Sequence, residues 1–186
     1  SRGMSLSPPA SHQHLAVEAE LADGPCRFVR ERLRLPMGQE ASFGWLRHPP
    51  SVLVVPWLED GRLLLMRRWR PAVGQWVLEF PACPLLSGES PAEGAERLLE
   101  GLIGRGNGLW HPLGELWPNP GYSDERMTIG SMALELEGSD GRPDGELSRL
   151  ERWRPRDLEA AFSALAERVD SRSVSAWFLA RRREGG

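Results

Sequence analysis

Short runs of alternating apolar and polar positions predict strands in the first third of the chain. Residues 26–35 (CRFVRERLRL) place apolar and charged side chains at roughly every second position, which is typical of a half-exposed strand. A Pro-Met-Gly turn follows, and residues 41–46 can form the hairpin partner. Residues 51–58 (SVLVVPWL) are nearly continuously apolar, as in a strand buried at the centre of a sheet. This part of the chain is therefore predicted to be rich in β-structure.

The remaining pattern mixes strands with helices. Asp60-Gly61 favours a tight turn, so residues 62–69 are predicted to return as a partner strand. A helix is predicted over residues 91–103, because Pro91 suits a first helical turn and Ser90 can cap it. Further strands are expected at 76–80, 113–117 and 127–136, and further helices at 155–169 and 173–180. This order favours an α+β fold, an α/β/α sandwich around a mixed sheet.

Composition and charge narrow the class of protein. The 186 residues, 40% of them hydrophobic, are enough for one domain with a real core. A net charge of −3 gives no basic field for nucleic acid, and no apolar run approaches the ~18 residues that span a membrane. The two cysteines lie too far apart for metal-type spacing, so a reduced, cytoplasmic setting is expected. Residues 1–14 are expected to be a cloning scar and flexible arm, followed by a single domain over residues 15–186.

Several motifs resemble, in order and at matching spacing, the Nudix hydrolase family. Over residues 26–180 the chain is most similar to the ADP-ribose and ADP-sugar pyrophosphatase branch. The segments that carry this resemblance are GRLLLMRRWRPAVGQWVLEFPA (61–82), GESPAEGAERLLEGLIG (88–104), Asn119-Pro120-Gly121 and VDSRSVSAWFLA (169–180). The resemblance implies a Nudix fold with a mixed sheet and an N-terminal strand arm. It also implies a homodimer formed through that arm, over residues 15–48.

The family's metal-binding helix face is altered in this chain. The resemblance implies that Mg²⁺ is held by three glutamates, one directly after a box arginine and two more three and four residues later, which share one face of the helix. The arginine corresponds to Arg97, and the three slots then fall on Leu98, Gly101 and Leu102. Leucine and glycine side chains cannot coordinate Mg²⁺. We therefore expect no metal at the box and little or no ordinary family activity, with Mg²⁺ as cofactor only if the protein is active.

No catalytic residue is assigned, but some acidic and box residues remain of interest. Glu89 and Arg97 keep the box pattern, and the resemblance implies that they pair to hold the box loop, although they could also be unrelated surface charges. Glu100 and Glu125 are candidates for a relocated metal site. Asp144 and Glu146 match the acidic loop in which the branch often keeps its catalytic base. Each of these carboxylates alone also fits a solvated surface position.

Two functions of different classes remain open at this point. The resemblance places the substrate-binding positions at Arg68, Arg70, Glu79, Pro120 and Gly121, although the arginines could also be ordinary charges at a strand end. In the first hypothesis the protein is a catalytically impaired binder of a nucleoside diphosphate derivative, such as a nucleoside diphosphate sugar, or of a protein partner. In the second it is an active Mg²⁺-dependent hydrolase with relocated carboxylates. The apolar pair Leu98 and Leu102 fits a site converted to packing, and drift in a decayed enzyme is also compatible with it.

Overall fold

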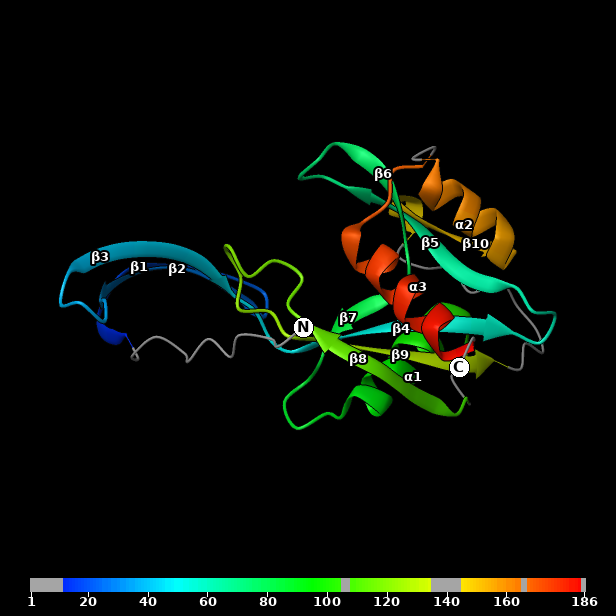
Figure 1. The fold of residues 1–186 in the computed structure, drawn as a ribbon, viewed down its shortest axis with the longest axis horizontal. Coiled ribbons are helices and arrows are strands. Elements are labelled where there is room, and N and C mark those ends of the chain that lie inside the picture. The colour runs from blue at the N-terminus through cyan, green and yellow to red at the C-terminus, as the bar shows by residue number, and fades with distance from the viewer. Residues whose placement is uncertain (1–11, 105–107, 135–144, 165–166, 185–186) are drawn as a thin grey trace, which may run out of the picture. The chain divides into compact units, whose positions relative to one another are not determined.

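A mixed sheet of seven strands forms the centre of the larger of two compact units (Figure 1). The computed structural model describes residues 12–104, 108–134, 145–164 and 167–184. The strand order is β10-β5-β4-β9-β8, with β6 paired to β5 and β7 paired to β4. Strands β4 and β9 run parallel, whereas the other pairings are antiparallel. The strands are β4 (Ser51–Leu58), β5 (Leu63–Arg70), β6 (Gln75–Glu79), β7 (Ala82–Pro84), β8 (Trp110–Leu116), β9 (Met127–Leu134) and β10 (Ser148–Trp153).

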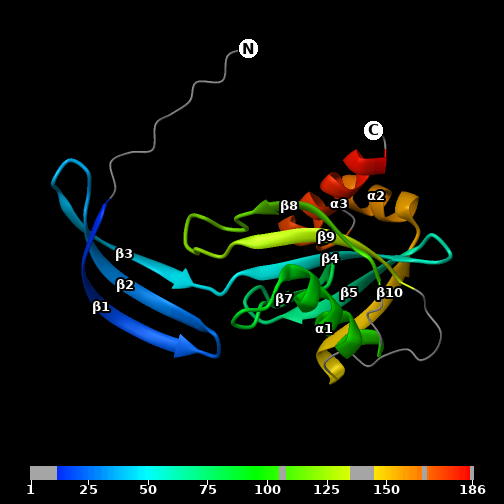
Figure 2. The same ribbon diagram turned by 90° about the horizontal axis from the view of Figure 1, so that it is seen from below.

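Helices cover both faces of this sheet. Successive residues of a strand point to opposite faces, so β4 supplies two separate clusters of buried side chains. Val52 and Val54 pack with residues of α1 (Pro91–Ile103), whereas Leu53 and Val55 pack with residues of α2 (Pro155–Ser163) and α3 (Ser171–Glu184). Figure 2 shows α1 on one side of the sheet and the other two helices on the opposite side. These layers confirm the predicted α/β/α sandwich.

Helix α1 begins and ends at the residues predicted from the sequence. The Ser90 hydroxyl accepts a hydrogen bond from the Glu93 N–H at 3.3 Å, and the Glu93 carboxylate accepts one from the Ser90 N–H at 2.8 Å. This reciprocal capping box satisfies backbone donors that an uncapped helix leaves unpaired. At the other end Gly104 has φ 79°, a left-handed conformation that glycine adopts without steric cost. The ends of the box helix are therefore set by local chemistry.

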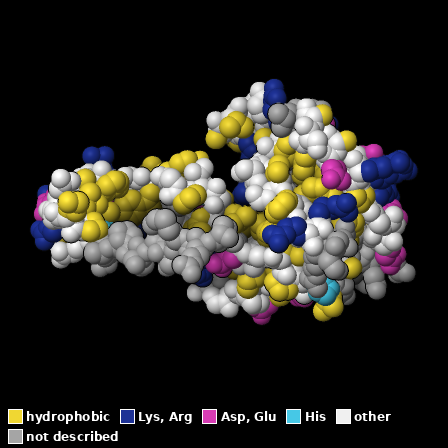
Figure 3. All heavy atoms as spheres, viewed as in Figure 1, with side chains coloured by type: hydrophobic (Ala, Val, Ile, Leu, Met, Phe, Trp, Pro, Cys, Tyr) yellow, Lys and Arg dark blue, Asp and Glu magenta, His cyan; other side chains and the backbone are white. Residues whose placement is uncertain are grey.

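The N-terminal strands form the second compact unit. This unit comprises the chain up to His48 together with Asn119–Glu125. Its sheet has the order β1-β2-β3, with β1 (Gln13–Asp23), β2 (Cys26–Arg34) and β3 (Glu40–Arg47) all antiparallel. Figure 3 shows hydrophobic side chains gathered over part of these strands. The strand β1 includes the last two residues of the expected flexible arm, and residues 1–11 lie outside the described part of the chain.

Two strands and several element bounds differ from the sequence predictions: β8 begins at Trp110 rather than at residue 113, and α3 runs over Ser171–Glu184 rather than over residues 173–180. Neither β7 nor β10 was predicted, and α2 ends at Ser163 rather than at residue 169. The last residues of the predicted helix pair with β6 instead. Val169 forms an isolated bridge with Leu78, and the Arg168 carbonyl accepts a hydrogen bond from the Leu78 N–H at 2.7 Å. Among the described residues no helix has the length and apolar content needed to cross a membrane.

Candidate functional site

Glu89 and Arg97 form a two-point ion pair that holds the box loop against α1. Arg97 Nε donates to Glu89 Oε1 at 2.6 Å, and Arg97 Nη2 donates to Glu89 Oε2 at 2.8 Å. The same guanidinium donates to the Pro84 carbonyl at 3.0 Å, while Glu89 also accepts the Leu86 N–H at 2.8 Å. These bonds, with Arg97 first among the causes, lower the pKa of Glu89 from 4.5 to about 2. The predicted pair is confirmed, and its role in this structure is to fix the loop.

The three metal-ligand slots present an apolar surface. Leu102 is 6% exposed and belongs to the cluster of buried side chains between α1 and the sheet. Leu98 is partly buried and packs against that cluster, while Gly101 is exposed with open space where a Cβ would lie. No slot carries a side-chain oxygen, and Mg²⁺ binds through oxygen ligands, mostly carboxylates in proteins. The residues of this helix face therefore do not fit the family's metal.

The candidates for a relocated metal site come from different elements of the chain. Glu100 is exposed on α1, and Glu146 is exposed in the short 3-10 helix Gly145–Leu147. Glu125 belongs to the N-terminal unit, where its Oε1 lies 3.9 Å from His48 Nδ1. Asp144 lies outside the described residues. Within the part of the chain that the structure describes, no three His, Cys, Asp or Glu residues are grouped as a metal would require.

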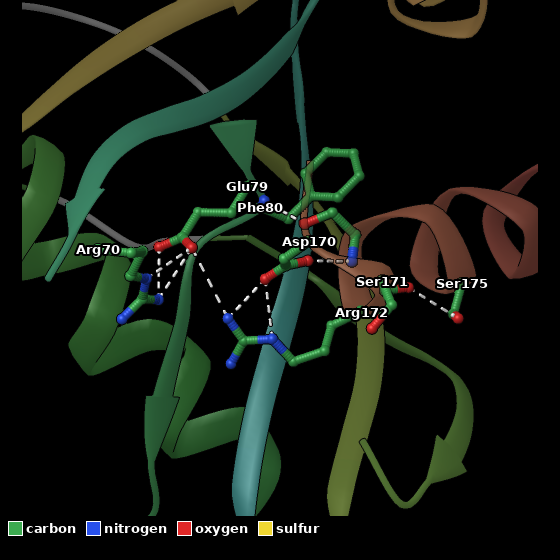
Figure 4. Close-up of polar contacts among 8 residues, drawn as sticks. Arg70, Glu79, Phe80, Asp170, Ser171, Arg172 and Ser175 are labelled. Atoms are coloured by element: carbon green, nitrogen blue, oxygen red, sulfur yellow. Dashed lines mark hydrogen bonds and ion pairs between the residues drawn. The ribbon is translucent and has the colours of Figure 1, made fainter. Parts of the chain in front are cut away.

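Arg70 and Glu79, two of the predicted substrate-binding residues, contact each other directly (Figure 4). Arg70 Nε donates to Glu79 Oε2 at 3.0 Å, and Arg70 Nη2 donates to Glu79 Oε1 at 2.7 Å. The Glu79 side chain is 3% exposed, whereas that of Arg70 is 38% exposed. Burial raises the pKa of Glu79, and the charge of Arg70 counters that effect. The pair is therefore a buried carboxylate neutralised by an arginine that solvent can still reach.

The start of α3 supplies further partners to this pair. Arg172 Nη2 lies 3.7 Å from Glu79 Oε2, and Arg172 also donates to Asp170 Oδ2 through Nε at 2.8 Å and Nη2 at 2.5 Å. Asp170 Oδ1 accepts the Ser173 N–H at 2.6 Å, as a residue at a helix N-terminus does. The buried Ser173 hydroxyl accepts the Phe80 N–H at 2.8 Å. Asp170, Arg172 and Ser173 were not among the predicted site residues, although they belong to the 169–180 segment of the family resemblance and their Asp-Ser-Arg-Ser order is typical of a helix start.

The remaining substrate-binding candidates belong to two different parts of the chain. Arg68 is half-buried on β5, in register with Ser148 of β10 and Val77 of β6. Pro120 and Gly121 are exposed in the Asn119–Glu125 segment of the N-terminal unit. The structure thus shows that Arg70 and Glu79 contact each other, and the substrate-binding role of all five residues stays a prediction.

Arg67, a neighbour of Arg68 on β5, is occupied by two carboxylates. Its Nε donates to Glu151 Oε1 at 2.5 Å and its Nη1 donates to Glu167 Oε2 at 2.8 Å. These bonds raise the pKa of the Arg67 guanidinium. Its role is to tie β5 to β10 and to the segment before α3, so it offers little to an anionic ligand.

Comparison with known proteins establishes the family. The model of the NUDIX domain matches residues 47–178, and the chain therefore belongs to the NUDIX domain family. The chain is similar to the ADP-ribose pyrophosphatase of Bacillus subtilis (27% identity over 99 residues, 53% of this chain and 54% of the relative). It is also similar to the ADP-ribose pyrophosphatase of Mycobacterium tuberculosis (29% over 123 residues, 64% of this chain and 59% of the relative).

A third relative and a solved structure extend the comparison. A methanol dehydrogenase activator of Bacillus methanolicus is 29% identical over 93 residues, which is 50% of each chain. The chain thus spans only about half to three fifths of the curated relatives that it matches. The crystal structure of an ADP compounds hydrolase has the same fold, with a TM-score of 0.75 and 24% identity over 95% of this chain and 96% of that one. These findings confirm the predicted resemblance to the ADP-ribose pyrophosphatase-like branch.

Removing the charge of Glu89 is expected to destabilise the box loop in a pH-dependent way. Glu89→Gln should lower the free energy of unfolding at pH 7 by about 1–2 kcal/mol, because it breaks a charge-assisted pair. The expected loss is kept small because the Arg97 side chain is 40% exposed, so solvent screens the pair. The pKa of Glu89 is lowered to about 2 by folding, so its stabilisation is complete above its ordinary value of 4.5 and is lost as the pH falls toward 2. Urea unfolding at pH 7, 4.5 and 3 measures the gap between parent and variant.

The matched control for this experiment is Glu96→Gln, which removes a charge from an exposed position of the same helix. It should change the unfolding free energy by no more than about 0.5 kcal/mol at each pH. A gap between parent and Glu89→Gln that stays constant from pH 7 to pH 3 would contradict the assigned role of the pair.

Proposed function

We propose that this NUDIX-family protein binds a nucleoside diphosphate derivative and has lost the family's ordinary Mg²⁺-dependent turnover. The observation that carries this proposal is the burial of Leu102 in the packing between α1 and the sheet, at a slot where the family pattern has a glutamate. The neighbouring slot residue Leu98 extends the same apolar surface. The loss is local, because the capping of α1 and the Glu89–Arg97 pair are both retained.

The size of the expected loss follows from what a metal does in diphosphate cleavage. A bound Mg²⁺ stabilises charge on phosphoryl oxygens and activates the attacking water, which together contribute several kcal/mol to the transition state. Each ~1.4 kcal/mol is a factor of ten in rate, so turnover should fall by roughly a thousandfold or more. A turnover assay with ADP-ribose, run with and without Mg²⁺, tests this half of the proposal.

Ligand binding is supported by the retained Arg70–Glu79 pair. Arginine contacts phosphate through two parallel hydrogen bonds, and the Arg70 side chain is accessible to solvent. Two of the relatives are named ADP-ribose pyrophosphatases, so ADP-ribose is the first ligand to test. Isothermal titration calorimetry with ADP-ribose in EDTA and in Mg²⁺ should give the same affinity in both buffers. Failure to bind ADP-ribose or any nucleoside diphosphate sugar would overturn the proposal.

The alternative is an active hydrolase with relocated carboxylates. Its supporting observation is that Glu100 is exposed beside Gly101, where a Cβ would meet open space. This hypothesis requires Mg²⁺- or Mn²⁺-dependent cleavage that falls when Glu100, Glu125 or Glu146 is changed to Gln. The same assay therefore separates the two functions.

A homodimer through the N-terminal strands forms the second part of the proposal. Leu21 of β1 and Phe28 of β2 pair in register, and their exposed fractions are 67% and 51%. Adjacent exposed apolar side chains of this kind are typical of protein interfaces. We expect sedimentation velocity to show a dimer. The double variant with Leu21→Asp and Phe28→Asp should raise the dissociation constant of this dimer at least tenfold. Val73→Asp, at an apolar residue of the other unit that is 62% exposed, is the control and should leave the dimer intact.

A further inference from the structure

Glu79 lies between two guanidinium groups that come from different elements (Figure 4). Arg70 of β5 binds it through two nitrogen atoms, and Arg172 of α3 lies 3.7 Å from its Oε2. Arg172 is also bound to Asp170, which lies directly before α3. The four side chains form a row in which positive and negative charges alternate: Arg70, Glu79, Arg172 and Asp170.

This row restricts what Arg70 can do for a ligand. Because the Glu79 side chain is 3% exposed, moving Arg70 away would leave a buried carboxylate without its main partner, which is strongly unfavourable. A diphosphate offers Arg70 the same two-point geometry that Glu79 offers. A ligand that takes the Nε and Nη2 donors of Arg70 in this two-point geometry therefore requires a second cation that can replace Arg70 at Glu79.

We propose that Arg172 is a positioning residue that takes over Glu79 when an anionic ligand engages Arg70. The ligand half of this inference rests on the proposed function. The move is small, because a separation of 3.7 Å needs to shorten by less than about 1 Å to become a hydrogen bond. Asp170 keeps a partner when Arg172 moves, since its Oδ1 accepts the Ser173 N–H. After the exchange Arg70 pairs with the ligand and Arg172 pairs with Glu79, so the buried Glu79 carboxylate keeps a cationic partner.

A double-mutant cycle with ADP-ribose tests the ligand half. Arg172→Gln should lower the affinity measured by calorimetry about tenfold, which corresponds to about 1.4 kcal/mol. Glu79→Gln removes the carboxylate that needs a cation, so adding Arg172→Gln to it should change the affinity by less than twofold. Arg156→Gln removes an arginine whose side chain is 75% exposed and should leave the affinity unchanged. An equal loss from Arg172→Gln in both backgrounds, or no loss in either, would overturn the role of Arg172.

A second experiment needs no ligand. In a crystal structure of Arg70→Gln, Arg172 Nη2 should lie within about 3.2 Å of Glu79 Oε2, compared with 3.7 Å in the parent. Thermal unfolding of the same variant checks that it is folded. If Arg172 keeps its distance from Glu79 when Arg70 is absent, the inference is wrong even where ADP-ribose binds. If the parent binds no ADP-ribose while Arg172 does close on Glu79, the proposed function and the ligand half fail and the exchange of partners at Glu79 stands.

Discussion

With Mg²⁺ present, the purified protein is expected to turn over ADP-ribose at no more than about one thousandth of the rate of a variant with the box restored. The restored variant carries Leu98→Glu, Gly101→Glu and Leu102→Glu, which returns a carboxylate to each slot of the family pattern. These charges destabilise the metal-free fold, and Mg²⁺, which binds only the folded state, offsets part of that cost. The physical reason is that a bound metal neutralises charge on the diphosphate, which stabilises the transition state by several kcal/mol. Release of ribose 5-phosphate and AMP, followed by chromatography, measures the rate.

The control for restored turnover is the same triple substitution with glutamine. Leu98→Gln, Gly101→Gln and Leu102→Gln together introduce the same polarity and nearly the same volume without a charge, so they should not restore turnover. Robust Mg²⁺-dependent turnover by the parent would overturn the proposal that its activity is impaired. A restored variant that is folded, binds Mg²⁺ and still fails to turn over would show that the lesion is not confined to the box.

Metal binding by the restored variant has a readout that does not depend on turnover. A ligand that binds only the folded state raises the unfolding temperature as its concentration rises. Mg²⁺ should therefore raise the melting temperature of the glutamate variant and leave that of the parent and of the glutamine variant unchanged. This measurement separates failure to bind the metal from failure of the chemistry.

Features governed by neighbouring residues were predictable from the sequence. The helix over residues 91–103 has the predicted bounds, because Ser90, Glu93 and Gly104 act on backbone groups within a few residues of themselves. The Glu89–Arg97 pair followed from the family pattern, and its two hydrogen bonds are present. Both features lie within one loop and one helix.

Features that depend on distant segments were not predictable from the local pattern. The strand β10 (SRLERW) alternates charged and apolar residues weakly, and its pairing with β5 is what defines it. The Ser173 hydroxyl accepts a hydrogen bond from the Phe80 N–H, which is 93 residues away in the sequence. Arg172, at the same helix start, lies 3.7 Å from Glu79. The burial of Glu31 at 3% exposed, paired with Arg47 and His14, is a similar long-range feature of the N-terminal unit. No composition or periodicity signal marks such contacts, because the chain itself must fold before they exist.

A single carboxylate at residue 102 is expected to be the most damaging change in the box helix. Leu102→Glu should lower the free energy of unfolding by about 3–5 kcal/mol at pH 7, because it removes a buried leucine and places a charge in the packing between α1 and the sheet. Leu102→Ala removes the packing alone and should cost less. Leu98→Glu changes a side chain that is only partly buried and should cost about 1–2 kcal/mol. Urea unfolding of the three variants measures the differences.

The pH dependence of the Leu102→Glu variant identifies the buried charge as the cause. Burial raises the pKa of a carboxyl group, so the folded state would hold its proton to a higher pH than the unfolded state does. Stability that depends on this proton is present at low pH and is lost as the pH rises through the raised value. The gap between Leu102→Glu and Leu102→Ala should therefore shrink from pH 7 to pH 5. A gap that is small at pH 7, or that does not change with pH, would mean that residue 102 is open to solvent and that the metal face has not become part of the core.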